Sequence, residues 1–271
     1  MAKGQTIMPI GKSLHIGISK VDPKSYPDWN VELPSAENDA GSMKTVADTQ
    51  GFASKILVTT GATSTTIIQA IREAAATLVP GDIFLLTYSG HGTTVPAQSG
   101  QKAENAWLAY DRLLKHSELR ELLCQFKGGV RILSFSDCCH SGGVIPVHLI
   151  SLVSELQRSA PLVTAVPATK VRAMLTSNPA LTGPEGSQEK RLKASLLAFS
   201  SSKSDKNSIA LTEHGLFTRK VLSIWDSGCF AGSYEQFFQA VRLALTKLQI
   251  PSLNVGGPHN QRFRDERPFA I

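Results

Sequence analysis

The amino-acid sequence predicts an α/β fold in which a mainly parallel sheet lies between helices. Two observations support this prediction. Short apolar runs alternate along the chain with longer segments whose apolar residues recur at helical spacing. In the first third of the chain the expected order is strand, helix, strand, helix, strand, which is typical of parallel strands joined by right-handed crossovers. Because a chain of 271 residues can bury one large core, we expect a single domain over residues 1–271.

The N-terminal elements follow from local patterns. Residues 13–18 alternate as a strand does, and a polar segment follows them. Ser35 is a suitable N-cap for a helix that Gly51 would end. A short strand is expected over 55–58, and an amphipathic helix over 63–78. Pro80 and Gly81 break that helix before the next apolar strand.

The rest of the chain continues the alternation, with one long interruption. We expect a polar loop at 93–101, a short strand near 106–110, a helix at 117–126, a buried strand from residue 130, a helical patch at 147–156, a long exposed loop up to residue 193, a strand over 194–200, helices at 215–225 and 233–248, and a last edge strand at 268–271.

Composition places the chain among ordinary globular proteins. Hydrophobic residues make up 42% and charged residues 18%, which excludes wholesale disorder. The longest apolar runs are too short to cross a bilayer, and the N-terminus lacks the apolar core of a secretory signal. The 4 cysteines include an adjacent pair and do not resemble a disulfide framework. We therefore expect a reducing, cytoplasmic location and no membrane partner.

The net charge of +6 raises the alternative of a nucleic-acid-binding module. The basic residues are spread over many segments, however, and no basic stripe interleaved with aromatic residues accompanies them. Solvated surface charge is the favoured interpretation.

Two expected strands end in chemically useful residues. The run that begins at Val130 ends in the sequence DCCHSGG, which contains Cys139, and the run over 82–92 ends with His91 between two glycines. Parallel strands that are neighbours present their carboxyl ends at one sheet edge, where open α/β sheets bind ligands. A thiol there can act as a nucleophile if a base takes its proton. The pair predicts a cysteine hydrolase.

Plainer interpretations exist for each residue. A lone His is more often structural, and one of two adjacent thiols, here Cys138, is expected to be a small buried hydrophobe. A metal site built from Cys124, Cys138, Cys139 and His140 is the competing explanation, but the spacing fits no C-x-x-C pair. A Ser nucleophile would need a G-x-S-x-G elbow, and the sequence has none.

The motifs YSGHG at 88–92 and DCCHSG at 137–142 resemble the metacaspase branch of the caspase-like cysteine peptidases, called orthocaspases in bacteria. The segments ENDA at 37–40, ENAW at 104–107, YDR at 110–112 and GLFT at 215–218 resemble other parts of that family. The resemblance implies a three-layer sandwich with a mainly parallel six-strand sheet between helices. It also implies a large-subunit-like part (1–142), a variable processing region (143–193) and a small-subunit-like part (194–271).

The resemblance further implies roles for particular residues. Cys139 would be the nucleophile and His91 the general base, and the backbone N–H groups of Gly92 and Cys139 would form the oxyanion hole. Asp39, Ser89 and Asp137 would line the specificity pocket. Carboxylates in that pocket favour a substrate Arg or Lys, and would repel the Asp that a true caspase accepts. The plainer roles of Asp137 and Asp39 are a helix cap and a charge in the first turn of a helix.

Two regulatory expectations follow. Many relatives bind activating calcium with paired acids after the YDR segment, but this chain has LLKHSE at 113–118, a poor supply of carboxylate oxygens. We therefore predict calcium independence and no cofactor. The processing region contains basic residues that an Arg- or Lys-specific site could cut in the chain itself, although a simple solvated linker is an equal alternative: Lys170, Arg172, Lys190, Arg191 and Lys193.

The expected partners are protein or peptide substrates with a basic residue at the cleavage site, and we expect a monomer. The alternative from another functional class is a catalytically silent, caspase-like regulatory or interaction protein. The presence of both His91 and Cys139 argues against it.

Overall fold

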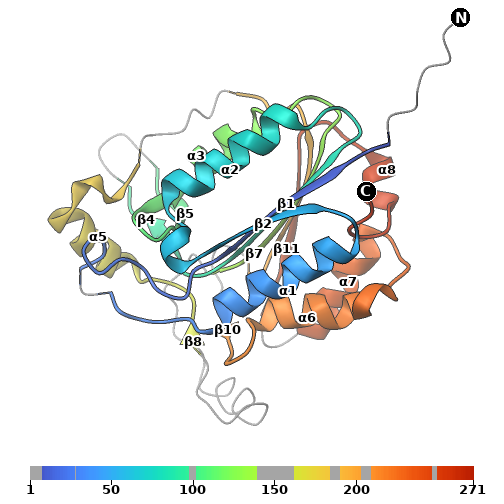
Figure 1. The fold of residues 1–271 in the computed structure, drawn as a ribbon. Helices are drawn as coiled ribbons and strands as arrows, with labels where there is room; N and C mark the ends of the chain where they lie inside the picture. Colours follow the sequence, from blue (N-terminus) through green and yellow to red (C-terminus); the bar gives the residue numbers. More distant parts are fainter. Residues whose placement is uncertain are drawn as a thin grey trace, which may run out of the picture.

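The computed structural model describes residues 8–27, 29–97, 102–138, 162–183, 190–202, 209–245 and 249–271. Its main sheet has 6 strands in the order β11-β9-β7-β3-β1-β2, and helices cover both faces (Figure 1). The strands are β1 (Gly11–Gly17), β2 (Ala53–Val58), β3 (Ile83–Ser89), β7 (Arg131–Asp137), β9 (Ser195–Ser200) and β11 (Ser252–Gly256). All neighbouring pairs are parallel except β9 and β11, which are antiparallel. The predicted fold class is confirmed.

Alternation along the central strands divides the core into two layers. On β3, Phe84 and Leu86 belong to the cluster under helices α2 and α3, whereas Ile83 and Leu85 belong to the cluster under α1, α6 and α7. The helices are α1 (Ser35–Thr49), α2 (Ser64–Thr77), α3 (His116–Leu123), α5 (Ala168–Ser177), α6 (Leu216–Trp225), α7 (Tyr234–Leu245) and α8 (Gln261–Asp265). Figure 1 shows α2 and α3 on one side of the sheet, with α1, α6 and α7 on the other. Both faces of β3 and β7 are buried, which explains the unbroken apolar run over residues 83–86 at the start of β3.

Most boundaries predicted from sequence agree with the structure. Helices α1, α2 and α6 begin and end within one or two residues of their expected limits. Gly51 follows α1 in the left-handed region with φ of 87°, as expected of a helix terminator. The proposed N-cap role of Ser35 is wrong, because Ser35 is the first helical residue and Pro34 occupies the cap without a side-chain bond. Short 3₁₀ helices cover Thr59–Gly61, Pro179–Leu181 and Asp226–Gly228.

The segment after His91 differs from the predicted polar loop. It forms β4 (Gly92–Val95), which pairs with β5 (Glu104–Leu108), and β5 pairs with β6 (Leu113–Lys115) in a small antiparallel sheet. The polar side chain of Thr93 is fully buried in this arrangement. Pairing of β4 with β5 therefore makes a strand of residues whose polar sequence predicted a loop.

The long exposed loop predicted to precede residue 193 is also wrong in part. Residues 168–177 form α5, which packs against β4 and buries Val171 and Met174. Residues 162–163 form β8 (Leu162–Val163), which pairs with β10 (Ile209–Ala210). The Pro, Gly and Ser content of the wider region hid these short elements. The helical patch predicted over 147–156 lies outside the described residues.

The predicted last edge strand at residues 268–271 is wrong. Phe269 has φ of 61°, is fully buried, and donates its backbone N–H to the hydroxyl of Tyr234 at 2.9 Å. Its ring packs against those of Phe135 and Trp225. The Phe269 ring is therefore part of the hydrophobic core under α6 and α7. The strand at this edge of the sheet is β11, which the sequence analysis did not predict.

Candidate active site

The register of the two central strands brings the predicted catalytic motifs together. Parallel pairing of β3 with β7 places Ser89 opposite Asp137. The residues two positions beyond this pair are His91 and Cys139. The described residues end at Cys138 here and Cys139 lies outside them. Cys138 is buried, with its Sγ 3.1 Å from the hydroxyl of Ser136, as expected for the inward-facing thiol. The two strands that lead into the motifs thus end at the same edge of the sheet.

His91 is held by backbone on both sides of its ring. Its Nε2 atom lies 2.9 Å from the carbonyl oxygen of Val31, and its Nδ1 atom lies 3.1 Å from that of Thr164. The ring of Trp29 meets it edge-on, with centroids 5.2 Å apart. Burial lowers the pKa of His91, so the ring is neutral at pH 7 and can accept a proton. A neutral ring donates only one N–H, and a donation from Nε2 to Val31 would leave Nδ1 as the base.

The turn that carries His91 is fixed by Tyr88. The Tyr88 hydroxyl lies 2.6 Å from the carbonyl oxygen of His91 and 3.0 Å from that of Leu108, and its ring stacks on Trp107 at 4.3 Å. A Cβ atom on Gly90 would lie 2.8 Å from that hydroxyl. This explains why the residue before His91 is glycine.

A short segment covers the predicted oxyanion donor. The backbone N–H of Gly92 donates to the carbonyl of Thr164 at 3.0 Å, and the N–H of Val166 donates to the carbonyl of Gly92 at 2.9 Å. The Thr93 hydroxyl donates to the carbonyl of Val166 at 2.9 Å. Residues 164–166, called here the strap, therefore lie along the start of β4. The Thr164 carbonyl contacts both His91 and the N–H that would hold a substrate oxyanion.

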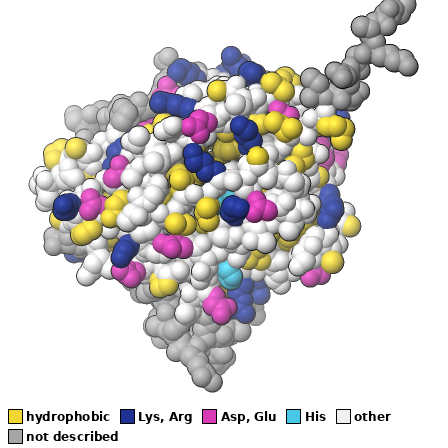
Figure 2. All heavy atoms as spheres, in the orientation of Figure 1, with side chains coloured by type: hydrophobic (Ala, Val, Ile, Leu, Met, Phe, Trp, Pro, Cys, Tyr) yellow, Lys and Arg dark blue, Asp and Glu magenta, His cyan; other side chains and the backbone are white. Residues whose placement is uncertain are grey.

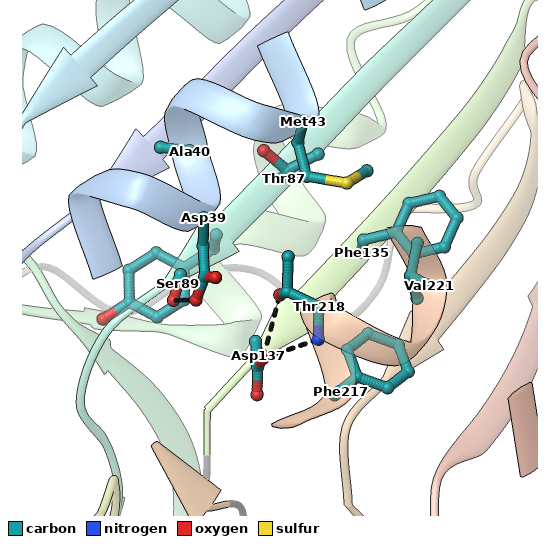
Figure 3. A pocket seen from close by; sticks show the side chains of 11 residues that line it. Asp39, Ala40, Met43, Thr87, Ser89, Phe135, Asp137, Phe217, Thr218 and Val221 are labelled. Atoms are coloured by element: carbon teal, nitrogen blue, oxygen red, sulfur yellow. Dashed lines mark hydrogen bonds between the residues drawn. The ribbon is translucent and has the colours of Figure 1, made fainter. Parts of the chain in front are cut away.

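The structure brings together all three residues predicted to line the specificity pocket. Asp39 on α1, Ser89 at the end of β3 and Asp137 at the end of β7 line one narrow, partly open cavity of about 10 Å³. Figure 3 shows the two carboxylates and the Ser89 hydroxyl directed into the same space. Ser89 donates to Asp39 Oδ2 at 2.7 Å. The cavity is therefore negatively charged at its polar end and apolar at the other, where Met43 and Phe217 lie.

Helix α6 supplies pocket residues that the sequence analysis missed. Thr218 donates to Asp137 Oδ2 through its backbone N–H at 3.0 Å and its hydroxyl at 2.9 Å (Figure 3). Asp137 therefore also caps α6, as the plainer interpretation proposed. His214 contacts Asp39 Oδ1 through Nδ1 at 2.9 Å, and the N–H of Gly215 lies 3.1 Å from both Asp39 oxygens. The sequence analysis assigned the GLFT segment to a helix that resembles one in the family, but gave it no role in the pocket.

Gly215 allows the two carboxylates to converge. A Cβ atom there would lie 2.2 Å from Asp137 Oδ2 and 3.0 Å from Asp39 Oδ2. No side chain fits between them without displacing one. Burial raises the pKa of Asp39, and its bonds to His214, Ser89 and Gly215 oppose that rise.

The segment examined for calcium ligands is occupied by other interactions. Glu118 forms a two-pronged pair with Arg112 at 2.7 and 2.9 Å, and Glu104 accepts the backbone N–H of Ser117. Within the described ranges, no group of three or more His, Cys, Asp or Glu side chains could hold a metal ion. The competing metal site would use Cys139 and His140, which lie outside those ranges. Calcium independence and the absence of a cofactor stay predictions.

The candidate self-cleavage residues fall in two different settings. Lys170 and Arg172 are exposed on α5. Lys190 is exposed and pairs with Glu121 at 2.8 Å, while its carbonyl accepts bonds from Arg120 and Cys124. Arg191 and Lys193 are exposed in irregular chain before β9.

The surface has no single charge character where it can be seen. On the face drawn in Figure 2, basic and acidic side chains are interspersed among neutral ones. None of the helices in the described part of the chain has the length and apolar character needed to cross a membrane.

Comparison with known proteins agrees with this geometry. The caspase domain family matches residues 13–259. Metacaspase-7 and Metacaspase-4 of Arabidopsis thaliana are each 33% identical to the chain, over 151 and 148 residues. These matches cover 49% of this chain but only 35% and 34% of the two relatives, so the chain spans about a third of their length.

A solved structure matches over a greater length. The crystal structure of a protein from Geobacter sulfurreducens has a TM-score of 0.85 and 33% identity, covering 97% of this chain and 99% of that one. The fold, the paired His and Cys motifs and these matches define a class, the caspase-like cysteine peptidases. The chain belongs to the caspase domain family, and its resemblance to metacaspases is confirmed.

Proposed function

We propose that this chain is a cysteine endopeptidase that uses Cys139 and His91 to cut peptide bonds after Arg or Lys. The observation that carries the proposal is the pairing of Ser89 with Asp137 in the β3–β7 register. That pairing ends the two strands that lead into the catalytic motifs at one sheet edge, where Asp39, Ser89 and Asp137 line a pocket.

The proposed reaction has two halves. His91 takes the proton of the Cys139 thiol, and the thiolate attacks the carbonyl carbon of the substrate peptide bond. The negative charge that develops on the carbonyl oxygen is held by the N–H groups of Gly92 and Cys139. His91 then protonates the leaving amine, and a thioester forms. Water attacks the thioester with His91 again as base, which releases the acid product and the thiol.

The specificity follows from the charge of the pocket. Asp39 and Asp137 would attract a guanidinium or ammonium group, and a planar carboxylate suits the fork of Arg in particular. The ion pair between Glu118 and Arg112 supports the proposal that calcium is not needed, because the Glu118 carboxylate already binds the Arg112 guanidinium.

We also propose that the chain cuts itself in the processing region. A peptidase of this kind binds its substrate in an extended form, so Arg191 and Lys193 are better sites than Lys170 and Arg172, which are held in α5. Lys190 is less suitable because its carbonyl is bonded to α3. The strap supports a need for activation, since a substrate carbonyl must replace that of Thr164 on Gly92. We further propose a cytoplasmic monomer.

The test uses fluorogenic peptides that end in Arg, Lys or Asp, with and without calcium. Wild type is compared with Cys139→Ala, and each sample is analysed by intact mass. Release after Arg or Lys by wild type alone, unchanged by a chelator, supports the proposal. Release only after Asp contradicts the pocket assignment, and the absence of any fragment that depends on Cys139 contradicts self-cleavage. No release, even after the processing region is nicked, would favour the silent regulatory protein.

A further inference from the structure

A further ionisable group, His214, contacts one of the pocket carboxylates from outside the cavity and lies just before Gly215. Its Nδ1 atom is 2.9 Å from Asp39 Oδ1. The side chain of His214 is 24% exposed, whereas that of Asp39 is 1% exposed. The imidazole therefore connects a buried carboxylate of the pocket with solvent, and solvent protons can reach it.

The groups around this contact show what the imidazole can change. Within the described residues, the other hydrogen-bond partners of Asp39 are neutral donors, the Ser89 hydroxyl and the Gly215 N–H. Asp137 faces the contact from β7 across Gly215. Glu213 and Arg219 are exposed, of opposite sign, and act on His214 only at longer range. His214 is therefore the ionisable partner that can compensate the charge of Asp39.

We propose that His214 is a specificity-determining residue that acts through Asp39 and sets how much negative charge the pocket presents to a basic substrate side chain. The inference rests on the function proposed above, in which Asp39 and Asp137 receive that side chain. When the His214–Asp39 pair holds a proton, its net charge is zero and the substrate meets the charge of Asp137 alone. When the pair loses that proton, two carboxylates face the substrate. The net charge is the same whichever partner holds the proton.

The sign of the pH dependence follows. The hydrogen bond to Asp39 raises the pKa of His214 above its ordinary value. The pair therefore loses its proton at a higher pH than an isolated imidazole would. Preference for a charged over a neutral side chain increases as the pH rises through that transition.

A pair of matched substrates isolates this effect. Peptides ending in Arg and in citrulline have nearly the same shape but differ in charge, and the ionisation of the catalytic pair affects both alike. The ratio of their kcat/KM values is measured from about pH 5.5 to 9, with the inhibition constant of the citrulline peptide replacing its kcat/KM if its turnover is too slow. In wild type we expect this ratio to rise roughly tenfold, because one more carboxylate becomes available.

Two variants decide the cause. His214→Gln keeps an N–H donor but cannot carry the charge, so its ratio should stay high and nearly constant above neutral pH. His259→Gln, at an exposed histidine far along the chain, should behave as wild type. A flat ratio in wild type, or the same slope in His214→Gln, overturns the inference.

A binding measurement keeps the inference testable if no peptide is cut. In Cys139→Ala, the His214 ring is titrated by NMR with and without agmatine, a cation shaped like the Arg side chain. Because linkage is reciprocal, agmatine should lower the pKa of His214 by roughly one unit. Such a shift without any peptide cleavage supports the role of His214 while counting against the proposed peptidase. An unchanged pKa at saturating agmatine overturns it.

Discussion

Replacing Gly215 by Ala is expected to disable the proposed specificity pocket without changing either proposed catalytic residue. The new Cβ would lie 2.2 Å from Asp137 Oδ2, and ordinary contact begins near 3.4 Å, so the carboxylate must move by about 1.2 Å. That movement breaks its two bonds to Thr218. The Cβ would also press on Asp39 at 3.0 Å.

The magnitude follows from the bonds affected. A hydrogen bond to a charged group contributes about 1.5–3 kcal/mol, so we expect a loss of roughly 10- to 150-fold in kcat/KM on Arg peptides. A neutral P1 side chain does not use those charges and should lose less. The assay measures both peptide types at one pH, with circular dichroism and thermal unfolding recorded for each protein.

Gly41→Ala is the matched control. Gly41 lies on α1, two residues after Asp39, and a Cβ there would have nothing within 4 Å. The change should leave activity unaltered and stabilise the helix by about 1 kcal/mol. If folded Gly215→Ala cleaves Arg peptides within threefold of wild type, the cavity is not the specificity pocket.

Three further changes test other parts of the structure. Thr93→Val removes one hydrogen bond to the strap and should raise kcat/KM roughly fivefold, because the loss of about 1 kcal/mol favours the open site. Thr94→Val removes a hydroxyl that bonds Asn105 and should leave kcat/KM unchanged. Equal effects of the two substitutions would contradict the role of the strap. Phe269→Ala should lower the free energy of unfolding, measured in urea, by about 3–5 kcal/mol. Leu243→Ala, at a 65% exposed position, should change it by less than about 0.5 kcal/mol. Similar losses in the two variants would show that Phe269 is not part of the core. Burial lowers the pKa of His116 to about 4, so the unfolded state takes up the proton first and stability falls as the pH drops below about 6.5. His116→Gln should remove about 2 kcal/mol of the loss between pH 7 and 5, and an unchanged pH dependence would refute this.

The sequence predicted the central sheet well because its strands are buried on both faces. Runs such as that of β3 must be apolar throughout, and the glycines and small polar residues that follow mark where such strands end. The same ends carry Ser89, His91 and Asp137, whereas Asp39 lies on α1 and was predicted from the resemblance of its ENDA segment. Each had a motif or a resemblance to identify it.

The remaining parts could not be predicted, for identifiable physical reasons. Val31 acts through a backbone carbonyl, which every residue possesses. The strap is a segment of ordinary residues that pairs with β4 only in three dimensions. Phe269 resembled part of a strand because Pro-Phe-Ala-Ile is apolar, yet its positive φ depends on the aromatic core around it. The role proposed for His214 could not be predicted from the sequence, because it depends on a contact with Asp39, which lies far away along the chain.

The two pocket carboxylates also hold the fold together at this point, and this limits what their replacement can show. Asp137 caps α6 through Thr218, and Asp39 binds the N–H of Gly215 at the start of the same helix. Replacing either aspartate therefore removes pocket charge and loosens α6 at once, so a loss of activity would have two causes. His214 lies outside these capping bonds and is partly exposed. Its neutral substitution changes the charge of the pocket while both capping interactions remain. The electrostatic basis of specificity is therefore better tested at His214 than at either aspartate.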